Sequence, residues 1–384
     1  MSVTGSGRVG DSWWAQDNGV PPRGRGYQTN VSVAREDPTW DAFLAETAGG
    51  DHVQTSLWAR VKAPRGWRAV RLVVTRDGEI VAGAQLLKRS WAHLGGFGYV
   101  PSGPVVGVPD PALSTLVVEE LHRLARAHRL HYLVVQPPIN GQAVAARLQA
   151  GGFHPSPLVV AEAITFQLDL TRDIETILAQ MKPKTRYNLR LGLRRGVTVR
   201  QGDERDLPTF HALYLATSRR QGFPADSLEY FSHLWRVFHP YGNAELFIAE
   251  YEGHAVSALL AVPFGDTVLY KRGGWSGRCG DRRPNEVMHW AAIRWAKSRG
   301  FRSYNFGDVD LPTATAAPRE GRRPDRPADM DTVTRFKLGF GGQVTPGPPA
   351  FDYVYNAPLR WAYDTLFRKL ASPSLGIAVR HRLL

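Results

Sequence analysis

Two β-hairpins with similar turns lie 174 or 175 residues apart in this chain, and they constrain its fold more than any other feature. The segment from Arg76 to Ala84 can be overlaid on the segment from Glu250 to Ala258, with glycine in each turn and small residues in each returning strand. An acidic residue followed by glycine between two apolar runs is typical of a tight hairpin. A strand, a helix and a strand follow each hairpin. This repetition predicts an internal duplication of one unit, with a cleft between the copies.

The order of elements in each unit predicts the fold class. In the first unit, one helix begins at Asp37-Pro38 and a second begins at Asp110-Pro111, after the hairpin. In the second unit, a helix over residues 207–217 precedes the hairpin, and another helix begins at Pro284. Capping aspartate and first-turn proline are common helix starts. We predict an α/β (α+β) protein with two domains of mixed sheets flanked by helices, an order that resembles the GNAT-type acyltransferase core.

Composition and charge limit the function classes. The 384 residues, 43% of them apolar, suit two domains with separate cores. The single cysteine, Cys279, cannot form an internal disulfide and favours a reducing, cytoplasmic location. Without an apolar signal segment or a membrane-length apolar run, any membrane contact is expected to be peripheral. The formal net charge of +13 favours a polyanionic partner, although a basic solvated surface would give the same value.

Six short segments occur in an order that carries further information. They are Gln54–Lys62, Tyr99–Val105, Met181–Gly196, Thr217–Phe223, Tyr304–Asp308 and Phe336–Gly342. The last of them reads Phe-Lys-Leu-Gly-Phe-Gly-Gly and is the most specific. Together they resemble the ordered motifs of the Fem-type (FemABX) non-ribosomal peptidyltransferases, over residues 35–355. The departures from that pattern include Ser102 in place of an arginine and Asn305 in place of an aspartate.

The resemblance implies an aminoacyltransferase that forms peptidoglycan cross-bridges. Two GNAT-like domains would face each other across a cleft, and one would bind a muramyl-pentapeptide precursor. The side-chain amine of its stem peptide would attack the aminoacyl ester at the tRNA 3′ end. The implied partners are aminoacyl-tRNA and either UDP-MurNAc-pentapeptide or lipid II. No cofactor or metal is implied, and we expect a monomer.

The resemblance also suggests where the domains begin and end. Residues 1–30 are expected to form a disordered tail. Residues 31–168 and 346–384 are assigned to the precursor-binding domain, because the C-terminal segment is expected to return to it. Residues 169–345 are assigned to the aminoacyl-tRNA-binding domain. Within them, residues 313–331 are rich in proline and arginine and are interpreted as a mobile loop.

Candidate catalytic residues come from the last two motifs. Lys337 is expected to stabilise the oxyanion and orient the tRNA terminus, since the glycines that follow it permit a close backbone approach to a ligand. Asp308 is expected to accept a proton from the amine or to orient it. Phe336 is a candidate substrate contact. The alternatives are a surface lysine, a loop-capping carboxylate and a core phenylalanine.

Candidate precursor-binding residues come from three earlier motifs. Their family positions imply that Lys62 and Arg220 bind the pyrophosphate of the precursor, since lysine supplies a point charge and arginine a planar fork. A shift of one residue, to Arg219, stays open. Tyr99 is a candidate for the lining of the precursor cleft, with a core ring as the alternative.

A dense basic segment is the candidate tRNA site. Lys182, Lys184, Arg186 and Arg190 include pairs at i, i+4 spacing and therefore share helix faces. Such a helix can follow an RNA acceptor stem or anionic lipid headgroups, and it can equally be a solvated face.

Three rival functions stay open at this point. An acyl-CoA-dependent GNAT N-acyltransferase would need a phosphate-binding Gly-rich loop, which neither expected position contains. The same aminoacyl-tRNA chemistry on a natural-product acceptor is not distinguished by sequence. A non-catalytic RNA-binding protein would have the same charge but would not need Lys337.

Overall fold

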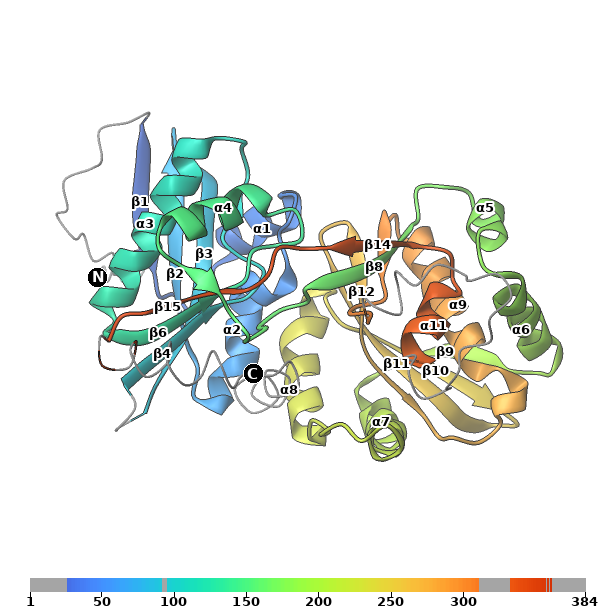
Figure 1. Ribbon diagram of the computed structural model, residues 1–384. Coiled ribbons are helices and arrows are strands. Elements are labelled where there is room, and N and C mark those ends of the chain that lie inside the picture. Colours follow the sequence, from blue (N-terminus) through green and yellow to red (C-terminus); the bar gives the residue numbers. More distant parts are fainter. Residues whose placement is uncertain (1–25, 92–94, 311–331, 357, 359, 361–384) are drawn as a thin grey trace, which may run out of the picture.

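The computed structural model describes residues 26–91, 95–310, 332–356, 358 and 360. Two α/β units lie side by side, each built around one mixed sheet (Figure 1). The prediction of two mixed sheets flanked by helices is confirmed. Within the described part of the chain, no helix has the length and apolar character needed to cross a bilayer.

The two sheets have matching strand orders. The first sheet contains, in spatial order, β1 (Tyr27–Ser32), β2 (Arg68–Arg76), β3 (Glu79–Trp91), β4 (Gly95–Val100), β6 (Leu130–Val135), β15 (Phe351–Val354) and β7 (His154–Pro155), with β5 (Val105–Val106) paired to β3. The second contains β9 (Thr198–Gly202), β10 (Glu245–Tyr251), β11 (His254–Phe264), β12 (Thr267–Trp275), β13 (Ser303–Asn305), β8 (Ile164–Asp169) and β14 (Gln343–Pro346). In both sheets the fourth and fifth strands are parallel and the other neighbours are antiparallel.

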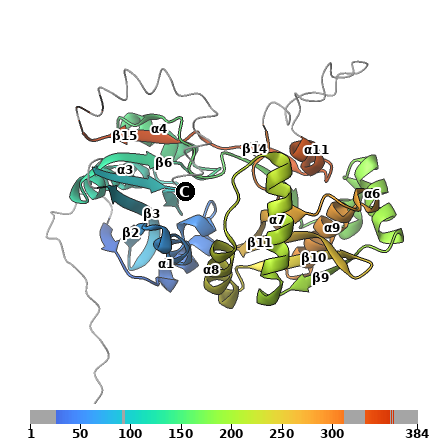
Figure 2. The same cartoon turned by 90° about the horizontal axis from the view of Figure 1, so that it is seen from below.

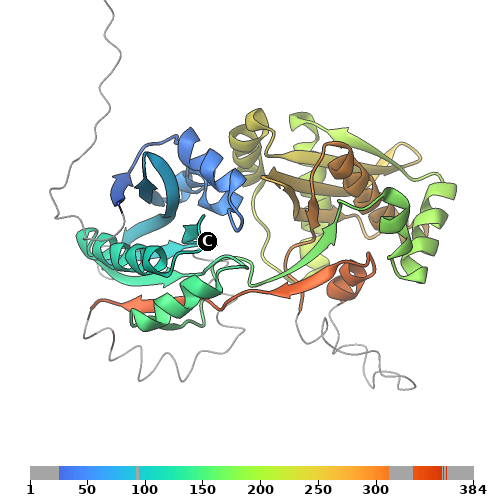
Figure 3. The ribbon, with the colours of Figure 1, turned by 90° about the horizontal axis from the view of Figure 1, so that it is seen from above.

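The two units exchange one strand each. The strand β8 follows β7 in the chain but lies in the second sheet, between β13 and β14. The strand β15 follows β14 but lies in the first sheet, between β6 and β7. Both crossing segments are visible in Figures 1 and 3. Each sheet is therefore completed by a strand that directly follows, in the chain, a strand of the other sheet.

The two hairpins also match in detail. Asp77 and Gly78 have φ of 54° and 87°, and Glu252 and Gly253 have φ of 51° and 74°. Two successive positive φ values define the tight turn that fits the twist of antiparallel strands. Each hairpin has a register break, after Val74 in β2 and after Ala249 in β10. The structure therefore selects the overlay with an offset of 175 residues.

Helices cover both sheets and fill the junction between them. In the first unit they are α1 (Pro38–Glu46), α2 (Ser56–Lys62), α3 (Pro111–Ala127) and α4 (Gln142–Ala150). In the second they are α5 (Ile174–Ala179), α6 (Pro183–Arg194), α7 (Leu207–Gln221), α8 (Leu228–Phe238), α9 (Pro284–Ser298) and α11 (Thr332–Leu338). Asp37 and Asp110 accept hydrogen bonds from the backbone N–H groups of the first turns of α1 and α3, as predicted.

An apolar cluster joins the two units. The helix α2 of the first unit packs against α8 of the second (Figure 1), and Figure 2 shows α8 on the side of the second unit that faces the first. The rings of Trp58 and Phe238 are 6.4 Å apart, and His233 donates a hydrogen bond of 3.0 Å to the backbone oxygen of Arg60. Burial of one large apolar side chain contributes about 1.5–3 kcal/mol. A junction of several such side chains therefore holds the two units in a fixed position relative to each other.

Some of the segments in the expected domain organisation lie outside the residues that the structure describes. The proposed mobile loop, residues 313–331, and most of the C-terminal segment lie outside the described residues. Most of the expected tail also lies outside them, but its last residues, from Tyr27 onward, pair with β2. The boundary drawn at residue 168 falls within β8, all of which pairs in the second sheet.

Candidate active site

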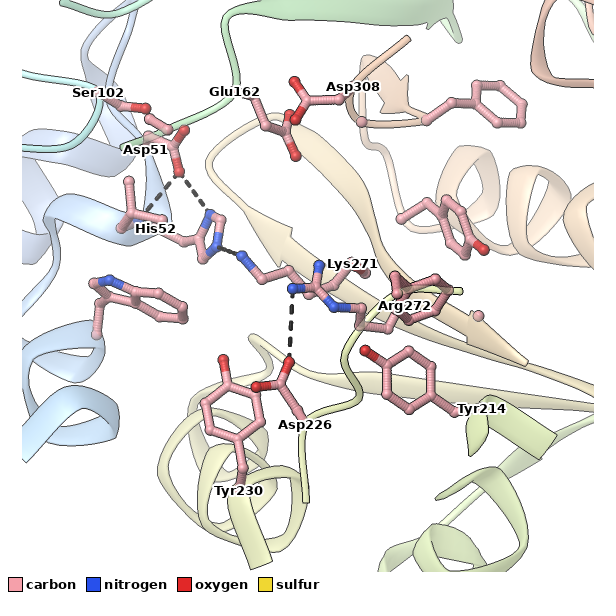
Figure 4. Close-up of a pocket in the computed structure, with 18 of the residues that line it drawn as sticks. Asp51, His52, Ser102, Glu162, Tyr214, Asp226, Tyr230, Lys271, Arg272 and Asp308 are labelled. Carbon is pink, nitrogen blue, oxygen red and sulfur yellow. Dashed lines mark hydrogen bonds and ion pairs between the residues drawn. The ribbon is translucent and has the colours of Figure 1, made fainter. Parts of the chain in front are cut away.

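Two cavities adjoin at the junction of the units. The first has a volume of about 440 Å³ and is lined by side chains from both units. The second has a volume of about 520 Å³. Asp51, His52, Ser102 and Glu162 line both cavities and therefore form the wall between them. Figure 4 shows these side chains around the first cavity.

Lys337 lies in the first cavity at the end of α11. Its side chain is only 8% exposed, and its Nζ donates a hydrogen bond of 2.6 Å to the backbone oxygen of Asp308. The turn that follows is held close to the protein's own backbone: a Cβ at Gly341 would lie 2.2 Å from the oxygen of Gln180. The glycines of this motif therefore serve tight packing of the turn within the protein. The result is a cation with a fixed position.

A group of positive charges occupies another part of the same cavity. Lys62 is buried at the end of α2, with its Nζ 4.8 Å from the ring centre of Trp58. Arg65 and Arg272 reach Asp226 at 2.8 and 3.7 Å. Burial, and then the charge of Arg65, lower the pKa of Lys62 to about 7. An anion bound here would restore the charge of Lys62, so this region favours a phosphate-type ligand.

Asp226 is an ion-pair partner in this group. Although burial alone would raise its pKa, Arg272 and Arg65 hold the pKa of Asp226 below its ordinary value. The carboxylate therefore stays ionised and keeps the two guanidinium groups oriented toward the cavity.

A hydrogen-bonded chain crosses from one unit to the other. Asp51 and His52 lie at the short helix η1 (His52–Gln54), and Lys271 lies on β12. The Oδ1 of Asp51 is 2.6 Å from Nδ1 of His52, and Nε2 of His52 is 3.0 Å from Nζ of Lys271 (Figure 4). Burial, and then the charge of Lys271, lower the pKa of His52. A neutral His52 with its proton on Nδ1 donates to Asp51 and accepts from Lys271.

Glu162 lies at the opposite side of Lys271 from Asp226 in Figure 4, close to Asp308. It belongs to the connection between β7 and β8, where the chain passes from the first unit to the second. Asn305 Nδ2 is 3.4 Å from its Oε2. Burial, and then the negative charge of Asp308, raise the pKa of Glu162 to about 7.

Of the six candidate catalytic and precursor-binding residues from the sequence, three line the first cavity and three do not. Lys62, Asp308 and Lys337 line it. Arg220 is exposed and lies over the ring of Trp275 at 4.6 Å, although its neighbours Thr217 and Gln221 line the cavity.

The other two candidates belong to apolar clusters. Tyr99 is 1% exposed, packs edge-on against Trp67, and lines neither cavity. Its hydroxyl has no hydrogen-bond partner among the described residues. Phe336 packs against His289 and Phe340, with ring centres 5.5 and 5.4 Å away. Both rings therefore pack among other aromatic side chains, as the core alternatives for Tyr99 and Phe336 expected.

The basic segment forms α6, at the far end of the second unit from the junction (Figure 1). Lys182, Lys184 and Arg190 are exposed, and none of the four candidate residues lines a cavity. Arg186 donates a hydrogen bond of 2.7 Å to the oxygen of Ala179 and a second bond to the oxygen of Met181. Arg186 is therefore occupied with the end of the preceding helix.

Sequence reasoning missed several residues that line the first cavity. They are Asp51, His52, Glu162, Asp226, Lys271 and Arg272. They come from separate loops and strands, so no spacing within the sequence marks them as a group. The available signal was the Lys-Arg pair that directly follows the apolar run Val268–Tyr270 within β12, since charges are rare in such a position. Among the described residues, no His, Cys, Asp and Glu side chains are grouped as a metal site.

Comparisons with known proteins agree with this architecture. A model of the FemAB family matches residues 36–154, and a model of an acetyltransferase (GNAT) domain matches residues 181–312. The lipid II:glycine glycyltransferase of Staphylococcus aureus (strain MRSA252) is 23% identical over 415 residues, which cover 88% of this chain and 96% of the relative.

Solved structures show the same fold. The crystal structure of FemX has a TM-score of 0.76 and 22% identity, and the match covers 88% of this chain and 99% of that one. A tandem GNAT protein from the clavulanic acid biosynthesis pathway has a TM-score of 0.50 and 14% identity, with 86% and 99% covered. The predicted fold class of two tandem GNAT-like domains is therefore confirmed.

Proposed function

Since this chain belongs to the Fem-type (FemAB) family and is an acyltransferase by class, we propose that it transfers an amino acid from aminoacyl-tRNA to the side-chain amine of a peptidoglycan precursor. Similarity to lipid II:glycine glycyltransferases supports the acceptor class. In this proposal lipid II is the favoured acceptor over its soluble nucleotide precursor, and glycine is the first donor amino acid to test.

One observation carries this proposal: the first cavity holds two separate groups of charge. Lys62, Arg65 and Arg272 form the group that suits the diphosphate common to lipid II and to the UDP-linked precursor. Lys337 and the nearby carboxylates form the other group. A precursor bound by its diphosphate would extend its stem peptide toward the second group.

The chemistry proposed for the second group needs no external activation. The aminoacyl ester is already reactive, and its carbonyl oxygen gains negative charge as the amine attacks. A lysine ammonium with a fixed position can stabilise that charge without reorganisation during the reaction. The hydrogen bond from Lys337 to the oxygen of Asp308 provides such a position. Lys184 and Arg190 of α6, together with Lys182 directly before it, are the proposed contacts for the tRNA body.

The test is transfer of radiolabelled glycine from charged tRNA to purified lipid II and, separately, to UDP-MurNAc-pentapeptide. We expect label on a precursor, lost when the charged tRNA is first digested with RNase. Label on neither precursor, for glycine and for a mixed pool of charged amino acids, would contradict the proposal. Transfer of an acetyl group from acetyl-CoA in the same assay would replace it with the acyl-CoA function.

A further inference from the structure

We propose that Glu162 is the proton acceptor for the attacking amine and returns the proton to the leaving tRNA oxygen. This inference rests on the proposed function and adds a catalytic residue to it. It depends on the position of Glu162 in the wall that both cavities share and on the groups that surround its carboxylate.

The reaction requires a proton acceptor close to both substrates. An amine that enters as an ammonium ion must lose one proton to solvent before it attacks. The neutral nitrogen then bonds to the ester carbonyl carbon, and the bond between that carbon and the tRNA oxygen breaks. The nitrogen loses a second proton to the Glu162 carboxylate, and the resulting carboxylic acid gives it to the leaving oxygen. Atoms and charges balance, because one amine and one ester yield one amide and one hydroxyl.

The other carboxylates that line the first cavity are less suited to this role. Asp226 is paired with two arginines and lies with the diphosphate-binding group. Asp51 is hydrogen bonded to His52 and to the backbone N–H of Val53. Asp308 is exposed and lines only the first cavity. Glu162 is partly buried and reaches both cavities.

The last residue of β13 and the turn that follows it lie next to the Glu162 carboxylate. Asn305 Nδ2 lies 3.4 Å from Oε2 of Glu162, and a Cβ at Gly307 would lie 3.3 Å from its Oε1. Gly307 has φ of 75°, a conformation that favours glycine. The glycine therefore leaves room for the carboxylate beside the backbone, and the amide of Asn305 orients it.

Burial first, and then the surrounding charges, set the basicity of Glu162. Asp308 and Asp51 raise its pKa in addition to burial, whereas Lys271 and Lys337 lower it. The resulting pKa of about 7 is close to neutral pH, where a general base is most effective. Glu162 is ionised above this pH and can accept a proton there, and it is protonated and inactive as a base below it.

The experiment compares kcat of the wild-type protein and Glu162→Gln at saturating charged tRNA and lipid II, between about pH 5.5 and 8.5. Loss of a general base typically lowers the rate about 10²–10⁴-fold, so we expect a decrease of at least about 100-fold at pH 7.5. Deprotonation of the acceptor amine makes kcat rise with pH in every variant, so the test is the additional rise centred near pH 7, which should be absent from Glu162→Gln. The parameter is kcat because Lys62 also titrates near pH 7 in the free protein.

Two further variants separate catalysis from a structural role. Asp308→Asn removes a charge that raises the pKa of Glu162, so the rise of kcat should move to lower pH. Lys271→Met removes a charge that lowers it, so the rise should move to higher pH. Glu162→Asp keeps a carboxylate and should retain the pH-dependent rise at a reduced kcat. Glu204→Gln, an exposed glutamate in the second unit, is the matched control and should leave kcat unchanged.

The outcomes distinguish this inference from the proposed function. If the wild-type protein transfers no amino acid from tRNA, both are overturned. If the wild-type protein is active and Glu162→Gln keeps kcat within threefold, or keeps the rise near pH 7, only the role of Glu162 is overturned. If Glu162→Gln does not fold, the opposite pH shifts of Asp308→Asn and Lys271→Met decide the question.

Discussion

The two units share a strand order but differ where they meet the first cavity. In the second unit, β12 stays paired with β11 as far as Trp275 and carries Lys271 and Arg272 into the cavity. In the first unit, the equivalent strand β4 ends at Val100, and the chain turns away from β3 at Pro101. Of these two equivalent strands, β12 continues and presents charged side chains to the cavity, whereas β4 is followed by a loop.

The gap that this leaves in the first unit is filled by Gln54. Its side-chain amide donates to the backbone oxygens of Gln85, at 3.2 Å, and Pro101, at 2.6 Å. Its side-chain oxygen accepts a bond of 2.6 Å from the N–H of Gln85. Gln54 is 0% exposed, and it lies two residues before α2, the helix that ends at Lys62. By these bonds Gln54 fixes the start of the segment that leads into α2, and therefore also helps to position the buried Lys62 at the end of that helix.

This comparison suggests a division of work between duplicated units. The second unit presents the charges of its sheet directly and also supplies Lys337. The first unit supplies Asp51, His52 and Lys62 from elements that precede its hairpin. In the proposed function, the second unit contributes most to the chemical step and the first unit most to precursor binding.

Among the variants that compare the two units, Lys337→Ala should have the largest effect, and it tests the chemical role of the second unit. Loss of one fixed donor to a developing oxyanion typically costs about 3–4 kcal/mol, or about 10²–10³-fold in kcat. We expect this decrease in steady-state transfer to lipid II, with little change in KM. The control is Arg335→Ala, which removes an exposed cation from the same helix. A change in KM alone would instead place Lys337 in precursor binding.

A smaller effect is expected for Lys62→Met, which tests the binding role of the first unit. Loss of one phosphate-binding cation should raise KM for the UDP-linked precursor about tenfold, since a hydrogen bond to a charged group contributes about 1.5–3 kcal/mol. The measurement is KM for this precursor and for the free stem peptide, which lacks the diphosphate. Equal losses with both acceptors would contradict the assignment. Arg68→Met, an exposed substitution in the first unit, is the control.

The lowered pKa of Lys62 adds a test of the same residue by stability. The unfolded chain has the ordinary lysine pKa of 10.5 and the folded protein has about 7, so the unfolded chain binds more protons between these values. The stability of the wild-type protein should therefore rise as pH increases from about 7 toward 10. Lys62→Met should reduce this rise in chemical denaturation, and inorganic pyrophosphate should raise the melting temperature of the wild-type protein more than that of the variant.

His52→Gln should have a moderate effect, since it breaks the chain that links the units without touching the proposed reacting atoms. Glutamine cannot both donate to Asp51 and accept from Lys271 in the geometry of the imidazole. We expect several-fold lower kcat and a loss of about 1–3 kcal/mol in the free energy of unfolding, measured with denaturant. An unchanged kcat with lower stability would limit this chain to a structural role. His254→Gln, at an exposed turn, is the control.

Much of the fold was predictable because it depends on local signals. The Asp-Gly and Glu-Gly turns, the capping aspartates and the helix-starting prolines act within a few residues, and each occurs where expected. The placement of β8 and β15 in opposite sheets depends on pairing between distant segments, which periodicity does not encode. The part of the site with Lys62 and Lys337 was accessible through motifs.

The wall between the cavities was not accessible in this way. His52 and Lys271 are separated by 219 positions and belong to different units, which the packing of α2 against α8 holds together. Glu162 lies in a connection without regular structure, and its pKa depends on charges from other segments of the chain. Such properties arise from the assembled junction and not from any stretch of sequence.

The smallest effect is expected at α6, the helix of the second unit that carries exposed basic residues. The triple variant Lys182→Gln, Lys184→Gln and Arg190→Gln should raise KM for charged tRNA about threefold to tenfold and leave KM for lipid II unchanged. Removal of each cation that binds a phosphate should reduce the slope of log affinity against log salt by about 0.7–0.9. Arg186 is kept in this variant because it supports the end of α5.

The salt dependence separates the two interpretations of α6. If these side chains bind the tRNA body, the variant should lose part of the salt dependence of tRNA binding while its kcat stays the same. An unchanged slope together with unchanged vesicle binding would identify α6 as a solvated face, and tRNA recognition would then be confined to the aminoacyl end near the junction. A parallel measurement with vesicles containing anionic lipid shows whether the same charges respond to a membrane surface. Loss of vesicle binding together with an unchanged tRNA slope would assign α6 to the acceptor's membrane and not to the donor.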